Sequence, residues 1–415
     1  MTVLGAAPAT PLTNLGQRLR SLALLGPAFV AGVAYLDPGN VATNLTASSR
    51  YGYLLLWVIV AANLAAWVVQ YLSAKLGIVT GQSLPQLLGE RMKSRGWRIA
   101  YWGQAQIVAI ATDMAEVIGG ALALHLLFGF SMLTGGLITG AFSIAHLALR
   151  ESGRVRAFEV IILALIAATG IGFSSGLFAA PVDSSQMLGG FIPGFDGSES
   201  LLLAVGIVGA TVMPHAIYAH SALCRDRFNL PEYADAKRAI VKATKIDVTL
   251  AMGLAGAINI AIFLVGAVNL YGKNIDDSII GAHSAITTTL GAGIGTLFAI
   301  GLLASGVASS SVGTYASGVI SQGLLKFRIP AIAQRMIALA PALVVIAIAD
   351  NATMALVISQ VVLSLGIPFA LFPLVRMTSK VDVMGSLANG RAMKFLGYAI
   401  AVILTALNAT MLLLL

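Results

Sequence analysis

Charged side chains are scarce in this sequence. Aspartate, glutamate, lysine and arginine make up 10% of its 415 residues, whereas they make up about 25% of an ordinary soluble domain. Apolar residues account for 58% of the chain, and the mean hydropathy is +0.90. This composition argues against a soluble domain with one membrane anchor and predicts that the whole chain is an integral membrane protein.

Cysteine is almost absent as well. Cys224 is the only one, so no disulfide can form within the chain. The sequence also lacks a heptad array, a low-complexity tail and any sign of a second domain. We therefore expect a disordered cytoplasmic tail over residues 1–20 and a single transmembrane domain over residues 21–415.

Long apolar segments are what the sequence has in abundance. A helix needs about 20 mostly apolar residues to cross the hydrocarbon core of a bilayer. The sequence predicts an all-α fold of eleven transmembrane helices and leaves residues 306–330 unassigned after the eighth. The predicted spans lie near residues 22–46, 53–77, 99–128, 131–149, 157–179, 200–224, 248–271, 284–306, 331–349, 352–375 and 394–415.

The basic residues gather on one side of this predicted topology. If the N-terminus is cytoplasmic, 23 of the 25 lysines and arginines fall on the cytoplasmic side, and only Arg50 and Lys273 do not. This asymmetry follows the positive-inside rule. The net charge of +8 is then a topology signal and not a nucleic-acid surface, which would need folded soluble area. We expect a multi-pass protein of the cell membrane with an extracellular C-terminus.

One polar run interrupts the first span, at Asp37, Pro38, Gly39 and Asn40. An aspartate at membrane depth costs about 2.5–3.5 kcal/mol on insertion scales. Proline removes a backbone donor and glycine adjusts φ cheaply. A surface loop is the alternative, but apolar residues continue on both sides with no other charge. The run therefore predicts a broken membrane helix that lines a protein-enclosed cavity.

A second proline break is predicted in the sixth span, at Pro214. Pro38 and Pro214 each lie near the middle of the first span of a five-span block. Because five is odd, the second block starts on the opposite side of the membrane, as in inverted-repeat transporters. The sequence thus predicts one repeat over about 21–180, a second over about 200–376, and an additional helix over about 393–415.

Side chains that can bind a metal lie at both breaks. Asp37 offers a carboxylate, Asn40 an amide oxygen and Met213 a thioether, and the breaks free backbone carbonyls, which we assign to Ala34 and Ala210. Mg²⁺ and Ca²⁺ prefer oxygen alone, whereas a soft sulfur favours transition metals such as Mn²⁺ and Fe²⁺. Ordinary packing is the commoner role of methionine, but the position of Met213 at the break favours a ligand.

Two further acids, Asp113 and Glu116, lie inside the third span. They are three residues apart, so about 60° separates them on one face of a helix. Two acids placed in this way inside a membrane could pass a proton between them. The alternative is a purely structural hydrogen-bonded pair.

His215 and His220 are separated by about 140° around a helix, so they do not form the paired ligands of a zinc protease. Each could relay protons or be a satisfied core histidine.

The residues Ala34-Tyr35-Leu36-Asp37-Pro38-Gly39-Asn40 and Met213-Pro214-His215 resemble the signature pair of the Nramp divalent-metal transporters, which include the MntH-type manganese and iron permeases. The resemblance covers nearly the whole chain, and residues 313–323 are similar to that family's loop after the eighth span. It implies a LeuT-type fold and inward movement of Mn²⁺ or Fe²⁺ with protons.

The resemblance also implies roles for individual residues. The metal ligands it implies are Asp37, Asn40, Met213, Ala34, Ala210 and Gln360. The proton pathway it implies consists of Asp37, Asp113, Glu116, His215, His220 and Arg335. Two positions depart from the family pattern: Gln106 replaces an acid of some relatives, and Gln334 precedes Arg335 where many have two arginines.

The sequence therefore predicts a proton-coupled secondary active importer that works by alternating access, with the metal bound at the membrane midplane between helices 1 and 6. Its partners would be divalent metals, protons and the lipid bilayer, with no resident cofactor, nucleic acid or obligate protein partner. The alternatives are a sodium- or proton-coupled amino-acid carrier of the same fold, a channel, and an intramembrane metal-dependent hydrolase. Asp37 disfavours the carrier, because it would repel a substrate carboxylate, and the histidine spacing disfavours the enzyme.

Overall fold

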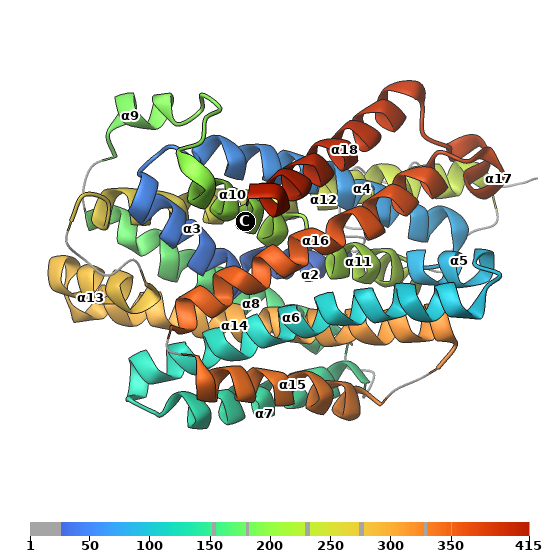
Figure 1. The fold of residues 1–415 in the computed structure, drawn as a ribbon. Helices are drawn as coiled ribbons and strands as arrows, with labels where there is room; N and C mark the ends of the chain where they lie inside the picture. Colours follow the sequence, from blue (N-terminus) through green and yellow to red (C-terminus); the bar gives the residue numbers. More distant parts are fainter. Residues whose placement is uncertain are drawn as a thin grey trace, which may run out of the picture.

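A computed structural model describes residues 26–151, 155–179, 182–228, 233–273, 278–327, 330–349 and 351–414. The expected tail over residues 1–20 lies outside them. The described residues form helices and no strand, packed side by side as one bundle (Figure 1). The helices are α2 (Pro27–Gly32), η1 (Val33–Leu36), α3 (Pro38–Tyr51), α4 (Leu56–Thr80), α5 (Leu84–Arg91), α6 (Arg95–Phe128), α7 (Met132–Glu151), α8 (Val155–Ser174), η2 (Ser175–Ala179), α9 (Ser184–Gly189), α10 (Gly197–Thr211), α11 (Pro214–Arg227), α12 (Ala234–Asn269), α13 (Ile279–Leu290), α14 (Ala292–Leu325), α15 (Ala331–Ile348), α16 (Ala352–Thr378), α17 (Val381–Met384), η3 (Gly385–Leu387) and α18 (Arg391–Leu414).

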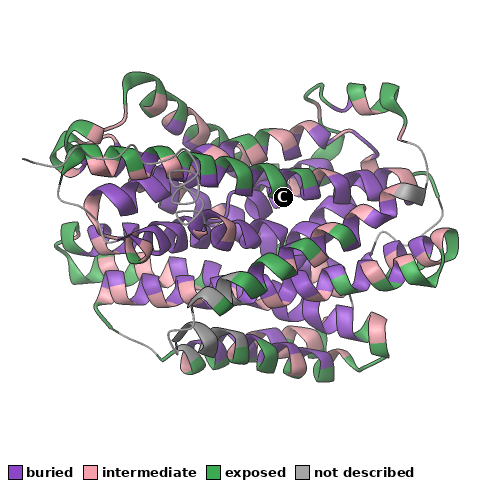
Figure 2. Cartoon of the chain, turned by 180° about the vertical axis from the view of Figure 1, so that it is seen from behind, coloured by how far each residue is buried: buried purple, intermediate pink, exposed green. Residues whose placement is uncertain are grey.

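The predicted eleven spans are confirmed in number. Within the described ranges, eight helical segments are long and apolar enough to cross a membrane. The interrupted helix α2–η1–α3 and the shorter apolar helices α7 and α15 supply the other three. Large apolar side chains such as Leu64, Ile107 and Phe142 are exposed, and exposed residues follow the outward faces of the helices (Figure 2). Such a surface suits lipid rather than water.

The predicted eighth span at 284–306 is wrong in its bounds. The chain breaks at Gly291 (φ 93°), and the span is α14, whereas α13 is a separate short helix. Residues 313–323 accordingly belong to a helix and not to a loop. Hydropathy does identify α14 as an apolar helix, but it does not mark the turn at Gly291, because apolar residues lie on both sides of it. The buried polar side chains of α14 are Ser305, Ser309, Ser310, Thr314, Ser317 and Ser321.

Both predicted helix breaks are present. Pro38 is the first residue of α3 and Pro214 is the first residue of α11, the position that proline tolerates best because its missing N–H has no helical partner there. Asp37 is extended (φ −68°, ψ 161°), and its side chain accepts the backbone N–H of Asn40. The aspartate therefore caps the second half of its own broken helix.

Two prolines inside α16, Pro368 and Pro373, leave the carbonyls of Ser364 and Phe369 without their usual helical donors. The Asn408 side chain of α18 donates to the carbonyl of Ser364 at 2.8 Å, and the Ser364 hydroxyl donates back to Asn408 at 2.7 Å. The Tyr101 hydroxyl of α6 donates to the carbonyl of Phe369. These bonds fix α16 between its neighbours in the bundle (Figure 1).

A buried carboxylate attaches the first half of the broken first helix to α12. Asp247 is 1% exposed and accepts the backbone N–H groups of Ala28 at 3.0 Å and Gly26 at 3.3 Å. Negative charge at a helix N-terminus is favourable because the first N–H groups have no helical acceptor. The position of α2 therefore depends on a side chain more than 200 residues away in sequence.

We predict that Asn408→Ala destabilises the protein, because it leaves the Ser364 carbonyl and hydroxyl without their partners on α18. The expected loss is about 1–2 kcal/mol, measured as a lower midpoint of thermal unfolding in detergent. Thr410→Ala is the matched control, since Thr410 is exposed on the same helix and bonds only within it. Equal shifts for the two variants would contradict this account.

Candidate functional site

Asp37 is enclosed by protein at the first break. The side chain is 0% exposed. One carboxylate oxygen accepts the backbone N–H of Asn40 at 2.8 Å, and the other accepts the side-chain N–H of Gln360 at 3.3 Å. The ion pairs found among the described residues include none to Asp37. Its charge is thus held by neutral donors alone, which leaves it available to a cation.

The two prolines free equivalent carbonyls. In an unbroken helix the carbonyl of Ala34 would accept from residue 38 and that of Ala210 from residue 214, but proline has no N–H to give. Among the described residues, the Ala34 carbonyl accepts a long bond from the backbone of Asp37, at 3.4 Å. The predicted assignment of freed carbonyls to these two alanines therefore has a direct cause in the sequence.

Asn40 joins the two breaks. Its side-chain N–H groups donate to the carbonyl of Tyr35 at 2.8 Å and to that of Ala210 at 2.7 Å. The amide oxygen accepts a long bond of 3.5 Å from Asn44. Asn259 of α12 also donates to the Tyr35 carbonyl, and Ser305 of α14 donates to the neighbouring Leu36 carbonyl. The irregular backbone is satisfied by side chains, as a protein-enclosed break requires.

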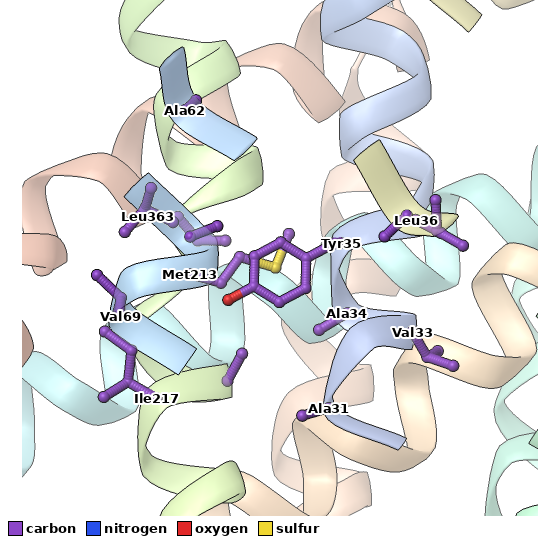
Figure 3. Close-up of a cluster of buried hydrophobic side chains, with 14 of the residues drawn as sticks. Ala31, Val33, Ala34, Tyr35, Leu36, Ala62, Val69, Met213, Ile217 and Leu363 are labelled. Atoms are coloured by element: carbon purple, nitrogen blue, oxygen red, sulfur yellow. The ribbon is translucent and has the colours of Figure 1, made fainter. Parts of the chain in front are cut away.

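Met213 is the residue immediately before α11 and is 0% exposed. Met213, Tyr35 and Ala34 belong to one cluster of buried apolar side chains, part of which is drawn in Figure 3. Within the described chain, histidine, cysteine, aspartate and glutamate do not gather in threes or more. A metal held here would therefore depend on the mixed set of carboxylate, amide, carbonyl and thioether.

Gln360 reaches the break from α16. A Cβ atom on Gly39 would overlap the Gln360 side chain, so the glycine makes the room that Gln360 fills. The oxygen Oε1 of Gln360 is buried and has no hydrogen-bond partner among the described residues. A buried acceptor without a donor is costly, and a bound cation would satisfy it.

Asp113 and Glu116 lie together on α6, facing α14 and α15. Arg335 of α15 is fully buried and donates to Asp113 at 2.9 Å, which makes a buried ion pair. A Cβ on Gly313 of α14 would lie 3.1 Å from Asp113 and 3.3 Å from both oxygens of Glu116. The absence of a side chain at Gly313 therefore leaves space for both carboxyl groups.

The turn of α6 that follows Glu116 contacts the metal-site break. A Cβ on Gly119 would overlap the ring of Pro38, so this glycine permits the close approach of α6 to α3. The pair of acids is thus next to the candidate metal site and not at a remote helix end.

The two histidines have separate partners. The ring atom Nδ1 of His215 lies 3.1 Å from the hydroxyl of Thr112, which itself donates to the carbonyl of Val108. The Nδ1 atom of His220 lies 2.6 Å from Oε1 of Gln70, whose N–H donates to the hydroxyl of Tyr35. A proton on Nδ1 of each ring would satisfy both contacts, and Nε2 of each ring has no hydrogen-bond partner among the described residues.

The two departures from the family pattern are also placed. Gln106 is held by α14, with its N–H donating to Ser321 at 3.0 Å and its oxygen accepting from Ser317 at 2.8 Å. A Cβ atom on Gly318 of α14 would lie 3.3 Å from both the nitrogen and the oxygen of the Gln334 side-chain amide, so Gln334 also lies close to α14. Gln106 is therefore a neutral link between α6 and α14.

Several residues of the site were not predicted from the sequence. Thr112 fixes His215, Gln70 connects His220 with Tyr35, and Gly313 gives room to the acids. Gln70 is one of a few polar residues in an apolar span, which was the one signal available for it. A glycine or threonine in a membrane helix carries no comparable signal, since both are common there.

Known proteins resemble this chain along its length. Residues 28–414 match the family profile described as Natural resistance-associated macrophage protein-like (Nramp). The divalent metal cation transporter MntH of Mycobacterium tuberculosis is 52% identical over 385 residues, which cover 93% of this chain and 90% of that protein. A crystal structure of the Eremococcus coleocola manganese transporter superposes with a TM-score of 0.85 at 31% identity, covering 96% of this chain and 87% of that one.

A more distant structure shares the fold alone. MhsT in complex with L-phenylalanine superposes with a TM-score of 0.64 at 12% identity, covering 94% of this chain and 98% of that one. These likenesses, with the two broken helices, confirm the predicted LeuT-type fold with its inverted repeats. They leave the roles of individual residues as predictions.

We predict that Gly39→Ala weakens Mn²⁺ binding about tenfold, because the added methyl group displaces Gln360 from Asp37 and removes one neutral ligand. Gln360→Ala should weaken binding to the same extent, and the double variant should add little. Isothermal titration of the purified protein measures these affinities. Gly253→Ala is the control, since its Cβ would meet open space; additive losses in the double variant would contradict the shared cause.

Proposed function

The chain belongs to the Nramp family, and on this premise we propose that it carries divalent transition metals such as Mn²⁺ and Fe²⁺ into the cell together with protons. It is a membrane transporter and not an enzyme. The observation that carries the proposal is the enclosed carboxylate of Asp37, which is held by neutral donors at the first break. The neighbouring Asn40 links this break to the Ala210 carbonyl at the second.

Metal selection follows from this donor set. Asp37 supplies the negative charge that a divalent cation needs, and the Asn40 and Gln360 amides and the Ala34 and Ala210 carbonyls supply neutral oxygen. Met213 adds the sulfur that favours Mn²⁺ and Fe²⁺ over Ca²⁺ and Mg²⁺. A substrate with a carboxylate, as an amino-acid carrier would bind, is repelled by the same Asp37.

Proton coupling would operate through the same carboxylate. A metal ligand must be deprotonated, so metal and proton compete for Asp37, and protonation releases the metal. Glu116 and Asp113 lie beside this site, and Arg335 holds Asp113. We assign the proton path to these acids, with His215 and His220 at the sixth-helix side of the site.

Alternating access would open each side of the enclosed site in turn. On one side, Asp247 holds the start of α2 through the N–H groups of Gly26 and Ala28. On the other, Arg50 at the end of α3 forms an ion pair with Glu199 near the start of α10. Release of the Asp247 contacts would open the cytoplasmic side, and release of the Arg50 pair would open the outer side.

The proposed orientation puts the N-terminus in the cytoplasm and the C-terminus outside the cell, in the cell membrane. It rests on the basic residues, which the eleven spans place on the N-terminal side with the exceptions of Arg50 and Lys273. In this orientation Asp247 and Arg335 lie toward the cytoplasm, and Glu199 lies toward the outside.

Asp37→Ala should abolish transport, because the site would lose its one charged ligand and its proton acceptor. We expect both Mn²⁺ uptake and the accompanying internal acidification of proteoliposomes to fall to the level of protein-free vesicles. Asp235→Ala, which changes an exposed aspartate on α12, should leave both signals intact. Metal flux that survives Asp37→Ala would refute the proposed site. Metal flux without acidification in the wild-type protein would refute proton coupling but would leave the proposed metal transport standing.

Met213→Ala should relax discrimination against Ca²⁺ more than it weakens Mn²⁺ uptake, because it removes the soft donor and keeps the oxygen ligands. Competition between Ca²⁺ and Mn²⁺ for uptake into proteoliposomes measures this selectivity. Met411→Ala is the matched control, since Met411 is a buried methionine of α18 away from the breaks. Unchanged exclusion of Ca²⁺ by Met213→Ala would count against the thioether as a ligand.

A further inference from the structure

A basic cavity of about 800 Å³ lies where α5, α16 and α18 come together. Four basic side chains line it, and Glu90 is the one acidic residue in its lining. The basic residues are Arg91, Lys93, Arg376 and Lys380. The proposed topology puts this cavity at the cytoplasmic surface of the membrane.

The charge of this basic cavity is only partly balanced by its neighbours. Glu90 is engaged by the side chain of Gln82 at 2.9 Å. Arg91 lies 3.4 Å from Asp382, but their side chains are 38% and 62% exposed, so this pair contributes little. Two acids against four basic groups leave an excess of positive charge, which attracts an anion.

An apolar groove of about 390 Å³ adjoins the basic cavity, and Met92 and Lys93 line both. Trp97, Ala100, Tyr101 and Phe369 line the groove on α6 and α16. Trp97 is 75% exposed and Phe369 is 49% exposed. An exposed tryptophan beside basic residues is typical of the boundary between headgroups and hydrocarbon.

We propose that the basic cavity and the apolar groove together bind one anionic phospholipid. The phosphodiester headgroup would lie among Arg376, Lys380 and Lys93, and an acyl chain would lie in the groove against Trp97 and Phe369. Basic pockets between membrane helices at the cytoplasmic side bind such headgroups. The adjoining groove distinguishes this ligand from a soluble phosphate, which would have no use for apolar surface.

The bound lipid would contact the part of α16 that contains Pro368 and Pro373. The groove is lined by Tyr101 and Phe369, and the Tyr101 hydroxyl donates to the Phe369 carbonyl that Pro373 frees. The same helix carries Gln360 to the proposed metal site. An anionic lipid therefore braces the helix that supplies one of the site's neutral ligands.

The test uses the full chain in phosphatidylcholine nanodiscs, into which phosphatidylglycerol with brominated acyl chains is titrated. Bromine quenches nearby tryptophan, and the difference from Trp97→Phe isolates the signal of Trp97. We expect saturable quenching by brominated phosphatidylglycerol and much weaker quenching by brominated phosphatidylcholine. Equal quenching by the two lipids would overturn the proposal, as would displacement of the lipid by inorganic phosphate at comparable concentration.

Charge-removing variants locate the headgroup. Arg376→Gln combined with Lys380→Gln should weaken phosphatidylglycerol binding roughly 30-fold. Arg391→Gln combined with Lys394→Gln removes two basic residues of α18 that line neither cavity, and should change binding less than about twofold. Equal losses would indicate a general basic belt and overturn the site. Tryptophan quenching measures lipid binding and needs no metal transport, so its result is independent of the Mn²⁺ uptake experiments. If a variant does not fold, the comparison of the two brominated lipids with the wild-type protein still decides the proposal.

Discussion

Prolines that free backbone carbonyls within the bilayer are the constraint on which this structure depends. Hydrocarbon offers no hydrogen-bond donor, so each freed carbonyl must find one in the protein. Asn40 supplies it for Ala210, Asn408 for Ser364 and Tyr101 for Phe369. Each donor comes from another helix, so the breaks that open the backbone also tie the bundle together. What is left without a good donor is the Ala34 carbonyl, which lies beside Asp37.

The two kinds of buried acid in this protein are stabilised differently. Asp113 has a permanent partner in Arg335, so its charge is compensated in the absence of any ligand. Among the described residues, Asp37 accepts from an amide and a backbone N–H, which stabilise a carboxylate less than a cation does. In the proposed mechanism this difference separates the roles of the two aspartates. Asp37, whose charge is poorly compensated, takes the metal or a proton. Asp113, whose charge Arg335 compensates, helps to conduct protons without binding the metal.

The sequence predicted most of the fold because proline and hydropathy act locally. Pro38 and Pro214 disrupt their helices whatever surrounds them, and apolar runs place the spans. The predicted eighth span had the wrong bounds because apolar residues lie on both sides of Gly291, so hydropathy does not mark the turn between α13 and α14. A different limit applies to the site. Asp37 and Met213 stand out by chemistry, whereas Gln70, Thr112 and Gly313 matter only through contacts with distant helices.

Asn40 suggests how metal binding could drive the transport cycle. In this structure its N–H group donates to the Ala210 carbonyl and so joins the two broken helices. In the proposed site a metal takes the Ala210 carbonyl and the Asn40 oxygen as ligands, and the Asn40 N–H competes with the metal for that carbonyl. Metal binding would therefore replace the hydrogen bond between the helices with a shared cation. When a proton on Asp37 displaces the cation, the hydrogen bond from Asn40 to the Ala210 carbonyl would form again. The contact between the two repeats would therefore depend on whether the site holds a metal or a proton.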